Sequence, residues 1–178
     1  MAVRYGPSDH ARHRDCAMRR ALPKMLAEFR RYWPNYLLQS ALATLVVFIL
    51  MLLLRMEEMV ITASLGSTAF IVFAMPKALT AQARNVVGGH MVGLGCGLLC
   101  ALLPAAGFAA QMLLASCAVG LSIFIMVVTD TEHPPASGTA LGTAMGGFAY
   151  QPVIAVIIGA VLLALVHRLA HRRMRDLA

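Results

Sequence analysis

Five apolar runs, each about as long as a membrane is thick, limit what this chain can fold into. They are Tyr36–Leu54, Met59–Met75, Asn85–Leu103, Ala109–Val128 and Pro152–Leu169. A helix needs roughly 20 apolar residues to cross the ~30 Å hydrocarbon core of a bilayer. Hydrophobic residues make up 60% of the 178, and charged residues only 13%, against roughly 25% charged in soluble domains. The sequence therefore predicts an all-α polytopic membrane protein.

A shorter apolar segment, 136–150, decides the predicted topology. Basic residues gather at both ends of the chain, and basic segments next to membrane spans stay in the cytoplasm. Five crossings would put the two ends on opposite sides, whereas a sixth, short crossing puts both inside. We therefore predict about six transmembrane segments over 36–170, between a basic cytoplasmic segment over 1–35 and a basic cytoplasmic tail over 171–178.

The basic ends also predict what the protein contacts. Eight of the fifteen Lys and Arg residues precede Tyr36, and four lie in 168–175. An amphipathic helix predicted over 17–33 suits the membrane surface, and both ends suit anionic lipids. Because no folded polar domain carries this charge, nucleic-acid binding is not expected. The predicted location is the inner (cell) membrane of a bacterium.

The segment that follows the fourth run, 129–139, carries the strongest functional signal, because two acids, an imidazole and two prolines adjoin an apolar helix. The prolines predict extended backbone at His133 and Pro134. A helix restarting near Ser137 would direct free N–H groups at this break, with the hydroxyls of Ser137 and Thr139 as further donors. Such a helix start favours an anion. The alternative is an ordinary proline loop with Ser137 as a helix cap.

A second candidate group, Arg84, Asn85 and His90, opens the third run. An unpartnered histidine in a membrane helix is costly, so His90 is predicted either to bind or gate a solute or to hydrogen-bond the 130–133 segment. Arg84 is either part of this site or a cytoplasmic anchor. Asp130 and Glu132 are poor ligands for an anion. They are predicted to pair with Arg84 or to carry protons, a role that an imidazole such as His133 fills better, or else to be ordinary surface acids.

Small hydroxyl residues inside the spans, among them Ser64, Ser67, Thr68 and Thr143, suggest a weak internal repeat. The sequence at 64–69 resembles that at 140–144. Three spans against three would form an inverted repeat, which is a common transporter arrangement with small residues at matching places. These hydroxyls are predicted either to line a solute path, facing each other across the repeat, or to serve ordinary helix packing.

Metal and enzyme chemistry are not expected. Cys96 and Cys100, like His167 and His171, are spaced i, i+4, but no further residues complete a four-ligand zinc set. His133 has an acid and a serine nearby, as in a catalytic triad, yet all three are crowded within eight residues around two prolines and cannot converge. No cofactor is predicted.

Three motifs in this order resemble the HPP family of integral membrane proteins, which is named for its His-Pro-Pro motif. They lie at 64–67, 81–90 and 129–136, and the resemblance covers roughly 36–169. It implies a small helical membrane protein, a type often described as having four spans and sometimes fused to a CBS domain. Plastid and cyanobacterial members are associated with nitrite transport, so the resemblance implies nitrite as a solute.

The sequence thus predicts a transporter or channel for a small inorganic anion, with nitrite implied by the resemblance. A transporter of another small solute and a non-transporting membrane scaffold or sensor remain as alternatives, and self-association is left open. The predicted solute-binding residues are His133, Pro134, Pro135, Ser137, Thr139, Arg84, Asn85, His90, Ser64, Ser67 and Thr143, and the predicted coupling residues are Asp130, Glu132 and His133.

Overall fold

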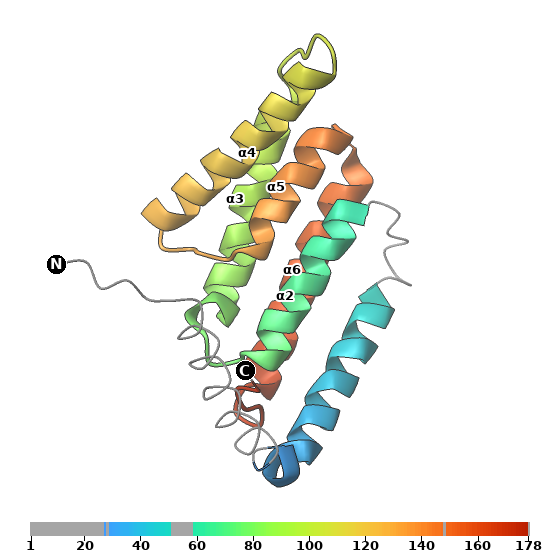
Figure 1. Ribbon diagram of the computed structural model, residues 1–178, viewed down its shortest axis with the longest axis vertical. Helices are drawn as coiled ribbons and strands as arrows, with labels where there is room; N and C mark the ends of the chain where they lie inside the picture. Colours follow the sequence, from blue (N-terminus) through green and yellow to red (C-terminus); the bar gives the residue numbers. More distant parts are fainter. Residues whose placement is uncertain (1–26, 28, 51–58, 148, 178) are drawn as a thin grey trace, which may run out of the picture. The chain divides into compact units, whose positions relative to one another are not determined.

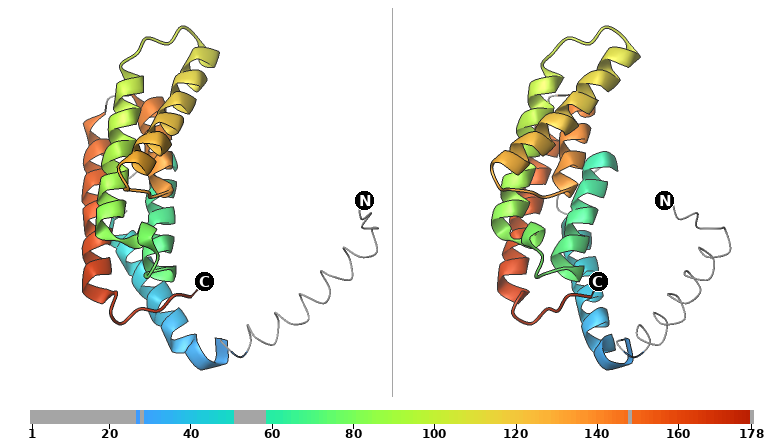
Figure 2. Two further views of the ribbon diagram at one scale, coloured as in Figure 1. Left: turned by 90° about the vertical axis from the view of Figure 1, so that its left-hand side faces the viewer. Right: turned by 60° about the vertical axis from the view of Figure 1, so that its left-hand side comes forward.

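The computed structural model describes residue 27 and residues 29–50, 59–147 and 149–177 (Figures 1 and 2). All regular structure within these ranges is helical, which confirms the predicted all-α architecture. The elements are the N-terminal helix Phe29–Leu50, α2 Met59–Ala74, the 3₁₀ turn η1 Leu79–Ala81, α3 Ala83–Ala101, α4 Phe108–Val128, α5 Pro135–Gly146 and α6 Tyr150–Ala170. Most of the predicted amphipathic helix over 17–33 lies outside the described residues. Residues 39–178 form the compact unit considered below.

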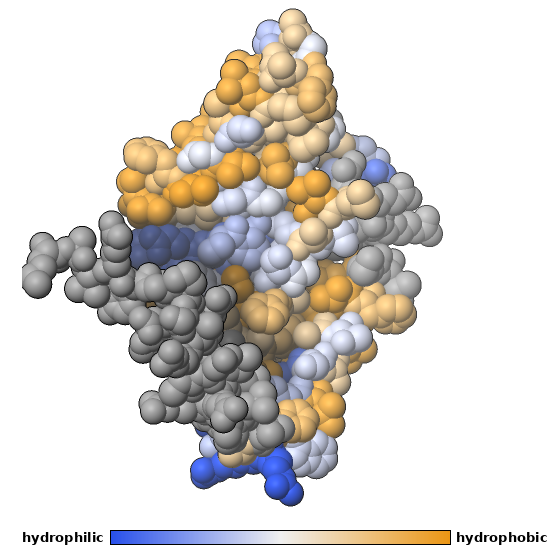
Figure 3. Space-filling view, viewed as in Figure 1, coloured by the Kyte–Doolittle hydropathy of each residue, from blue (hydrophilic) through white to orange (hydrophobic). Residues whose placement is uncertain are grey.

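Three helices, Phe29–Leu50, α4 and α6, are long and apolar enough to cross a membrane, and α2 is a shorter apolar helix of 16 residues. Large apolar side chains cover the outer faces of these helices, as Figure 3 shows for one side of the molecule. Phe70 of α2 is 60% exposed and Phe124 of α4 is 65% exposed. Such exposure suits contact with lipid, because lipid chains are themselves apolar. The chain is therefore a polytopic membrane protein.

The two least apolar helices, α3 and α5, lie among the others. α3 packs against α4, α5 and α6, while α5 packs mainly against α2, α3 and α4 (Figure 1). With 12 residues, α5 is about 18 Å long, well short of the ~30 Å hydrocarbon core. The backbone N–H and C=O groups at its two ends can lie at membrane depth only where neighbouring protein shields them from lipid. The predicted short segment is thus a helix held by its neighbours.

Glycine residues bring α5 very close to α3 and α2. A Cβ atom on Gly97 of α3 would lie 2.7 Å from the Ala140 carbonyl oxygen, and one on Gly93 would collide with the carbonyl oxygen of Ala136. A Cβ on Gly142 of α5 would lie 2.8 Å from Cγ1 of Ile61 in α2. Small residues that let backbones touch are typical of membrane helix pairs. They leave no gap between α3 and α5.

Hydrogen bonds gather several chain segments at one end of the unit. The side-chain amide of Gln39 donates to the carbonyl oxygens of Phe73 (2.6 Å) and Arg175 (2.8 Å). Nε2 of His167 lies 2.8 Å from the Pro76 carbonyl oxygen. Because a carbonyl oxygen only accepts, the imidazole donates. Gln39, the end of α2 and the C-terminal tail therefore lie at one end of the unit.

Candidate functional site

Five buried side chains meet in one hydrogen-bonded group, which we call the buried polar cluster. Its members are Ser64 and Thr68 of α2, His90 of α3, His133 of the link between α4 and α5, and Thr139 of α5. Ser64 is 5% exposed and the other four are completely buried. Polar groups removed from water are costly unless they are hydrogen-bonded. Burial of the cluster therefore costs folding free energy, which its hydrogen bonds offset only in part.

Thr68 lies at the centre of the cluster. Its Oγ1 is 2.9 Å from Nε2 of His90 and 3.0 Å from Nε2 of His133, and the centroids of the two imidazole rings are 5.1 Å apart. The same oxygen is 2.9 Å from the Ser64 carbonyl oxygen. One hydroxyl group thus touches two imidazoles that come from sequence positions 43 residues apart.

The outer nitrogens of the two imidazoles contact different partners. Nδ1 of His133 lies 2.8 Å from the carbonyl oxygen of Thr80 in η1, so this nitrogen must carry a hydrogen. Nδ1 of His90 lies 2.8 Å from Oγ1 of Thr139. The cluster therefore runs from the link between α2 and α3 into the middle of α5.

Ser64 connects the cluster to the first turn of α5. Its hydroxyl donates to the carbonyl oxygen of Pro135, and its Oγ is 2.9 Å from Oγ1 of Thr139. α2 and α5 are also close here, because a Cβ on Gly138 would lie 3.3 Å from Cβ of Ser64. The broken start of α5 is therefore fastened to α2 by side chains that also belong to the cluster.

The local backbone differs from the prediction at two points. Pro134 has helical dihedral angles (φ −51°, ψ −39°), and α5 begins at Pro135 rather than near Ser137. The predicted extended backbone at Pro134 was wrong, because the steric effect of a following proline is only a preference and proline suits a first helical turn. The N–H groups of Ala136 and Ser137, expected to be free, instead donate to the carbonyl oxygens of His133 and Pro134. They close the turn and do not point at an open site.

An ion pair covers the surface beside this turn. Nη1 of Arg84 lies 3.0 Å from Oδ2 of Asp130, and Nη2 of Arg84 donates to the Thr129 carbonyl oxygen at 3.0 Å. Nδ2 of Asn85 donates to the Glu132 carbonyl oxygen at 3.1 Å. The predicted pairing of Arg84 with an acid is confirmed. Since its side chains are 60% and 81% exposed, this pair adds under about 1 kcal/mol to stability.

Several predicted site residues lie away from the cluster. Ser67 is exposed and lines a groove of about 390 Å³ together with Pro134, Pro135 and two apolar residues of α2. The side chain of Glu132 is exposed and Ser137 is half-buried. Thr143 is buried one turn beyond Thr139 on α5, and its hydroxyl has no hydrogen-bond partner among the described residues.

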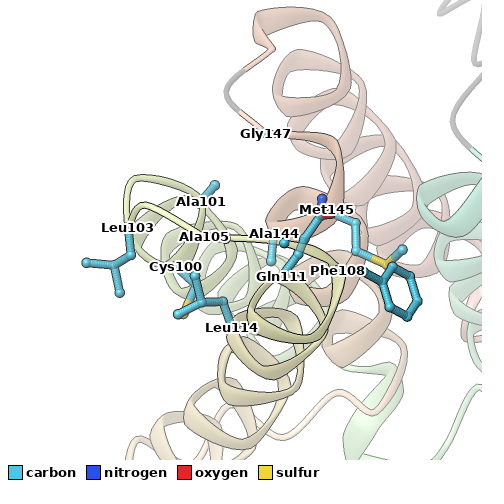
Figure 4. A pocket seen from close by; sticks show the side chains of 11 residues that line it. Cys100, Ala101, Leu103, Ala105, Phe108, Gln111, Leu114, Ala144, Met145 and Gly147 are labelled. Carbon is cyan, nitrogen blue, oxygen red and sulfur yellow. The ribbon is translucent and has the colours of Figure 1, made fainter.

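A larger cavity, of about 510 Å³, opens at the C-terminal ends of α3 and α5 and the N-terminal end of α4 (Figure 4). Cys100, Phe108, Gln111, Ala144 and Met145 contribute to its lining. Thr143, whose hydroxyl has no hydrogen-bond partner among the described residues, lies on α5 between Ala144 of this lining and Thr139 of the cluster. Sequence reasoning missed the polar side chain of Gln111, which has no motif around it.

Two backbone features of the site were also missed. A Cβ on Gly89 would lie 2.7 Å from Cβ of His133, and a Cβ on Gly88 would lie 2.9 Å from Cγ2 of Thr131. The glycine pair just before His90 was the signal for this close approach, because only glycine lets the link between α4 and α5 lie directly on α3. The described residues contain no group of three His, Cys, Asp or Glu that could hold a metal ion.

Comparisons with known proteins identify related membrane proteins. The family model described as HPP, transmembrane region, matches residues 29–176. A transmembrane protein of Dictyostelium discoideum is 31% identical over 115 residues, which is 61% of this chain and 40% of the relative. A second transmembrane protein of that organism is 33% identical over 85 residues, 48% of this chain and 27% of the relative.

This chain therefore spans less than half the length of either relative. No solved structure matches it. The family match covers the helices, the His-Pro-Pro turn and the buried polar cluster, and on that match the chain belongs to the HPP transmembrane family.

Proposed function

We propose that this protein carries a small inorganic anion, nitrite first among the candidates, across a bacterial cell membrane. The observation that carries the proposal is the buried polar cluster at the broken start of α5, enclosed in a unit whose outer surface is apolar. Ionisable residues inside a membrane are expensive, and in transporters they mark the path of the solute or of its coupling ion.

The polar side chains form a line through the unit. It starts at the 510 Å³ cavity, passes Thr143 and reaches the cluster at Thr139. The far side of the cluster ends at the Thr80 carbonyl oxygen in the link between α2 and α3. This line connects the two ends of the unit, so we assign it as the solute path.

The charge pattern around the path supports an anion. No carboxylate among the described residues contacts the cluster, since Asp130 is paired with Arg84 at the surface and the Glu132 side chain is exposed. Hydroxyl and imidazole hydrogens are the donors that the path offers. An anion with oxygen acceptors, such as nitrite, suits these donors.

Access to the cluster must alternate between the two sides. The cluster is closed to solvent, and the glycine contacts leave no space between α3 and α5. A solute can therefore enter only if α5 moves away from α2 and α3, which makes a carrier the better proposal than an open channel. The predicted inverted repeat fits this motion, because α2 and α5 are the short helices of 16 and 12 residues and they cross at Ser64 and Thr139.

The basic end of the unit supports a cytoplasmic position for both termini. Lys77 follows α2 and Arg84 lies in the first turn of α3, at the end that also holds the C-terminal tail with Arg172, Arg173 and Arg175. Positive charge next to spans remains on the cytoplasmic side, where it also attracts anionic lipids.

Uptake of isotope-labelled nitrite into proteoliposomes tests the proposal, with nitrate, formate and chloride as competing anions. The medium should be neutral to alkaline, because nitrous acid crosses lipid unaided. We expect saturable uptake that exceeds uptake by empty liposomes and that unlabelled nitrite suppresses. Uptake no greater than that of empty liposomes, for every anion tried, would remove the proposed function.

A further inference from the structure

The buried polar cluster contains more donor–acceptor pairs than it has hydrogens to fill them. Seven pairs of polar atoms lie within hydrogen-bonding distance. Oγ of Ser64 forms two of them, with the Pro135 carbonyl oxygen and with Oγ1 of Thr139. Oγ1 of Thr68 forms three, with the Ser64 carbonyl oxygen, Nε2 of His90 and Nε2 of His133. The last two join Nδ1 of His90 to Oγ1 of Thr139 and Nδ1 of His133 to the Thr80 carbonyl oxygen. Each pair needs one hydrogen.

Only five hydrogens are present when both imidazoles are neutral. Each of the three hydroxyl groups carries one, each neutral imidazole carries one, and the three carbonyl oxygens carry none. Two pairs therefore lack a hydrogen whichever tautomers the rings adopt. Buried lone pairs that face each other without a hydrogen are unfavourable. The geometry of the cluster thus suits a state with more protons.

One added proton has a defined place. Nδ1 of His133 already holds a hydrogen against the Thr80 carbonyl oxygen, so the added proton would occupy Nε2 and be donated to Thr68. Thr68 then donates its own hydrogen to Nε2 of His90. Six of the seven pairs can then hold a hydrogen, and only Thr68 Oγ1 with the Ser64 carbonyl oxygen lacks one. The proton could pass between the rings through the Thr68 hydroxyl. A second added proton would create two like charges on rings whose centroids are 5.1 Å apart.

Among the described residues, no acidic side chain contacts the two imidazoles to neutralise such a charge. In sequence, α2 and α5 carry no acidic or basic side chain, and α4 has only the exposed Cys117. α3 contributes Cys96 and Cys100 as well as Arg84, and Arg84 is engaged by Asp130 at the surface.

The remaining ionisable groups near the cluster face elsewhere. Lys77 and the side chain of Glu132 are exposed, and His167 of α6 binds the Pro76 carbonyl oxygen. A buried positive charge without a partner is strongly disfavoured. The proton therefore needs an anion beside it.

We infer that the cluster takes up one proton together with one anion, and that the Thr68 hydroxyl joins the two imidazoles as the proton-transferring group. The proton is the second ligand, and this inference rests on the proposed anion transport. The proton arrives with the anion and both leave on the other side, so the step is electrically neutral and no bond other than N–H and O–H changes.

Proteoliposomes loaded with a pH indicator, and with the membrane potential clamped at zero, measure both fluxes at once. An inward nitrite gradient should acidify the interior of wild-type vesicles by one proton per nitrite beyond the leak of empty liposomes. Imposing a membrane potential should leave the rate unchanged. Thr68→Val keeps the shape but removes the hydroxyl, and we expect the proton-to-nitrite ratio or the nitrite flux itself to fall to the empty-liposome level. Thr68→Ser should restore both.

Thr44→Val is the matched control, because the exposed Thr44 hydroxyl also bonds the carbonyl oxygen four residues earlier, at 2.9 Å from Ser40, and contacts no imidazole. It should behave as wild type. Wild-type nitrite flux without proton movement, or a Thr68→Val variant with wild-type flux and ratio, would overturn the proton site and leave the anion function standing. Absence of all nitrite flux in wild type would overturn the proposed function, and the inference with it. A thermal melt of each variant in detergent shows whether lost flux is lost folding.

Discussion

Replacing Gly93 with alanine is expected to destabilise the unit severely. The added methyl group would collide with the Ala136 carbonyl oxygen and would lie 3.4 Å from the Ala140 nitrogen. Both atoms belong to the backbone of α5, so no side chain can rotate out of the way. Overpacking of this kind costs typically 1–3 kcal/mol and sometimes more. Thermal unfolding in detergent, followed by helical circular dichroism, measures the loss.

Gly95→Ala provides the matched control two residues away on α3. No atom lies within 4 Å of a Cβ at Gly95, which is exposed. Alanine in place of glycine favours a helix by up to about 1 kcal/mol. The control should unfold at the wild-type temperature or above it. Equal stability of the two variants would show that α3 and α5 are not in backbone contact.

Gly89→Ala is expected to abolish most transport while leaving the protein folded. A Cβ at this position would lie 2.7 Å from Cβ of His133 and 3.1 Å from the carbonyl oxygen of Thr131. Carbon atoms in contact are normally about 3.5–4.0 Å apart, so the His-Pro-Pro turn must shift by roughly 1 Å. Misplacement of a functional group by about that distance lowers a rate by as much as ~100-fold. The altered His133 would lose its distances to Thr68 and the Thr80 carbonyl oxygen.

Initial nitrite uptake and the melting temperature should be measured together for Gly89→Ala. The expected result is uptake at least about tenfold below wild type with a melting temperature that falls less than in Gly93→Ala, because the closest contact is with a side-chain carbon of the link and not with the backbone of α5. Gly120→Ala on α4 is a control, since nothing lies within 4 Å of its Cβ. Wild-type uptake by Gly89→Ala would mean that the position of the His-Pro-Pro turn does not matter for transport.

The helical architecture was predictable from sequence because its causes are local. Apolar runs, the prolines and the placement of basic residues identify the spans without knowledge of their neighbours. The ion pair between Arg84 and Asp130 was also predictable, because both residues were expected on the same side of the membrane. Predicting this pair does not require knowledge of how the helices pack, since the two side chains are at the surface.

The buried polar cluster was predicted only in part, because its form depends on how helices pack. His90, His133, Ser64 and Thr139 were expected near a site, but the sequence did not indicate that the Thr68 hydroxyl joins both imidazoles. Nor did it indicate which hydroxyls face lipid: Ser67 is exposed, although it precedes a fully buried residue. The rotation of α2 about its own axis, relative to α5, decides which of its hydroxyls are buried. The hydropathy of the sequence does not predict this rotation.

The start of α5 at the His-Pro-Pro turn is a second feature that the sequence did not predict correctly. Sequence rules predicted free N–H groups at a helix beginning near Ser137, whereas the amides of Ala136 and Ser137 are used within the turn. The anion-favouring part of the site is therefore the imidazole and hydroxyl cluster behind the turn. This shifts the proposed binding chemistry from backbone amides to side chains that can also carry a proton.

The most direct test of the account compares nitrite uptake by wild type and His133→Ala at equal amounts of folded protein in proteoliposomes. His133 is the cluster residue that links the broken helix to both Thr68 and the Thr80 carbonyl oxygen. We expect saturable uptake to fall at least about tenfold in His133→Ala and to persist in the folded control Gly95→Ala. Equal uptake by wild type and His133→Ala would contradict a solute path through the buried polar cluster.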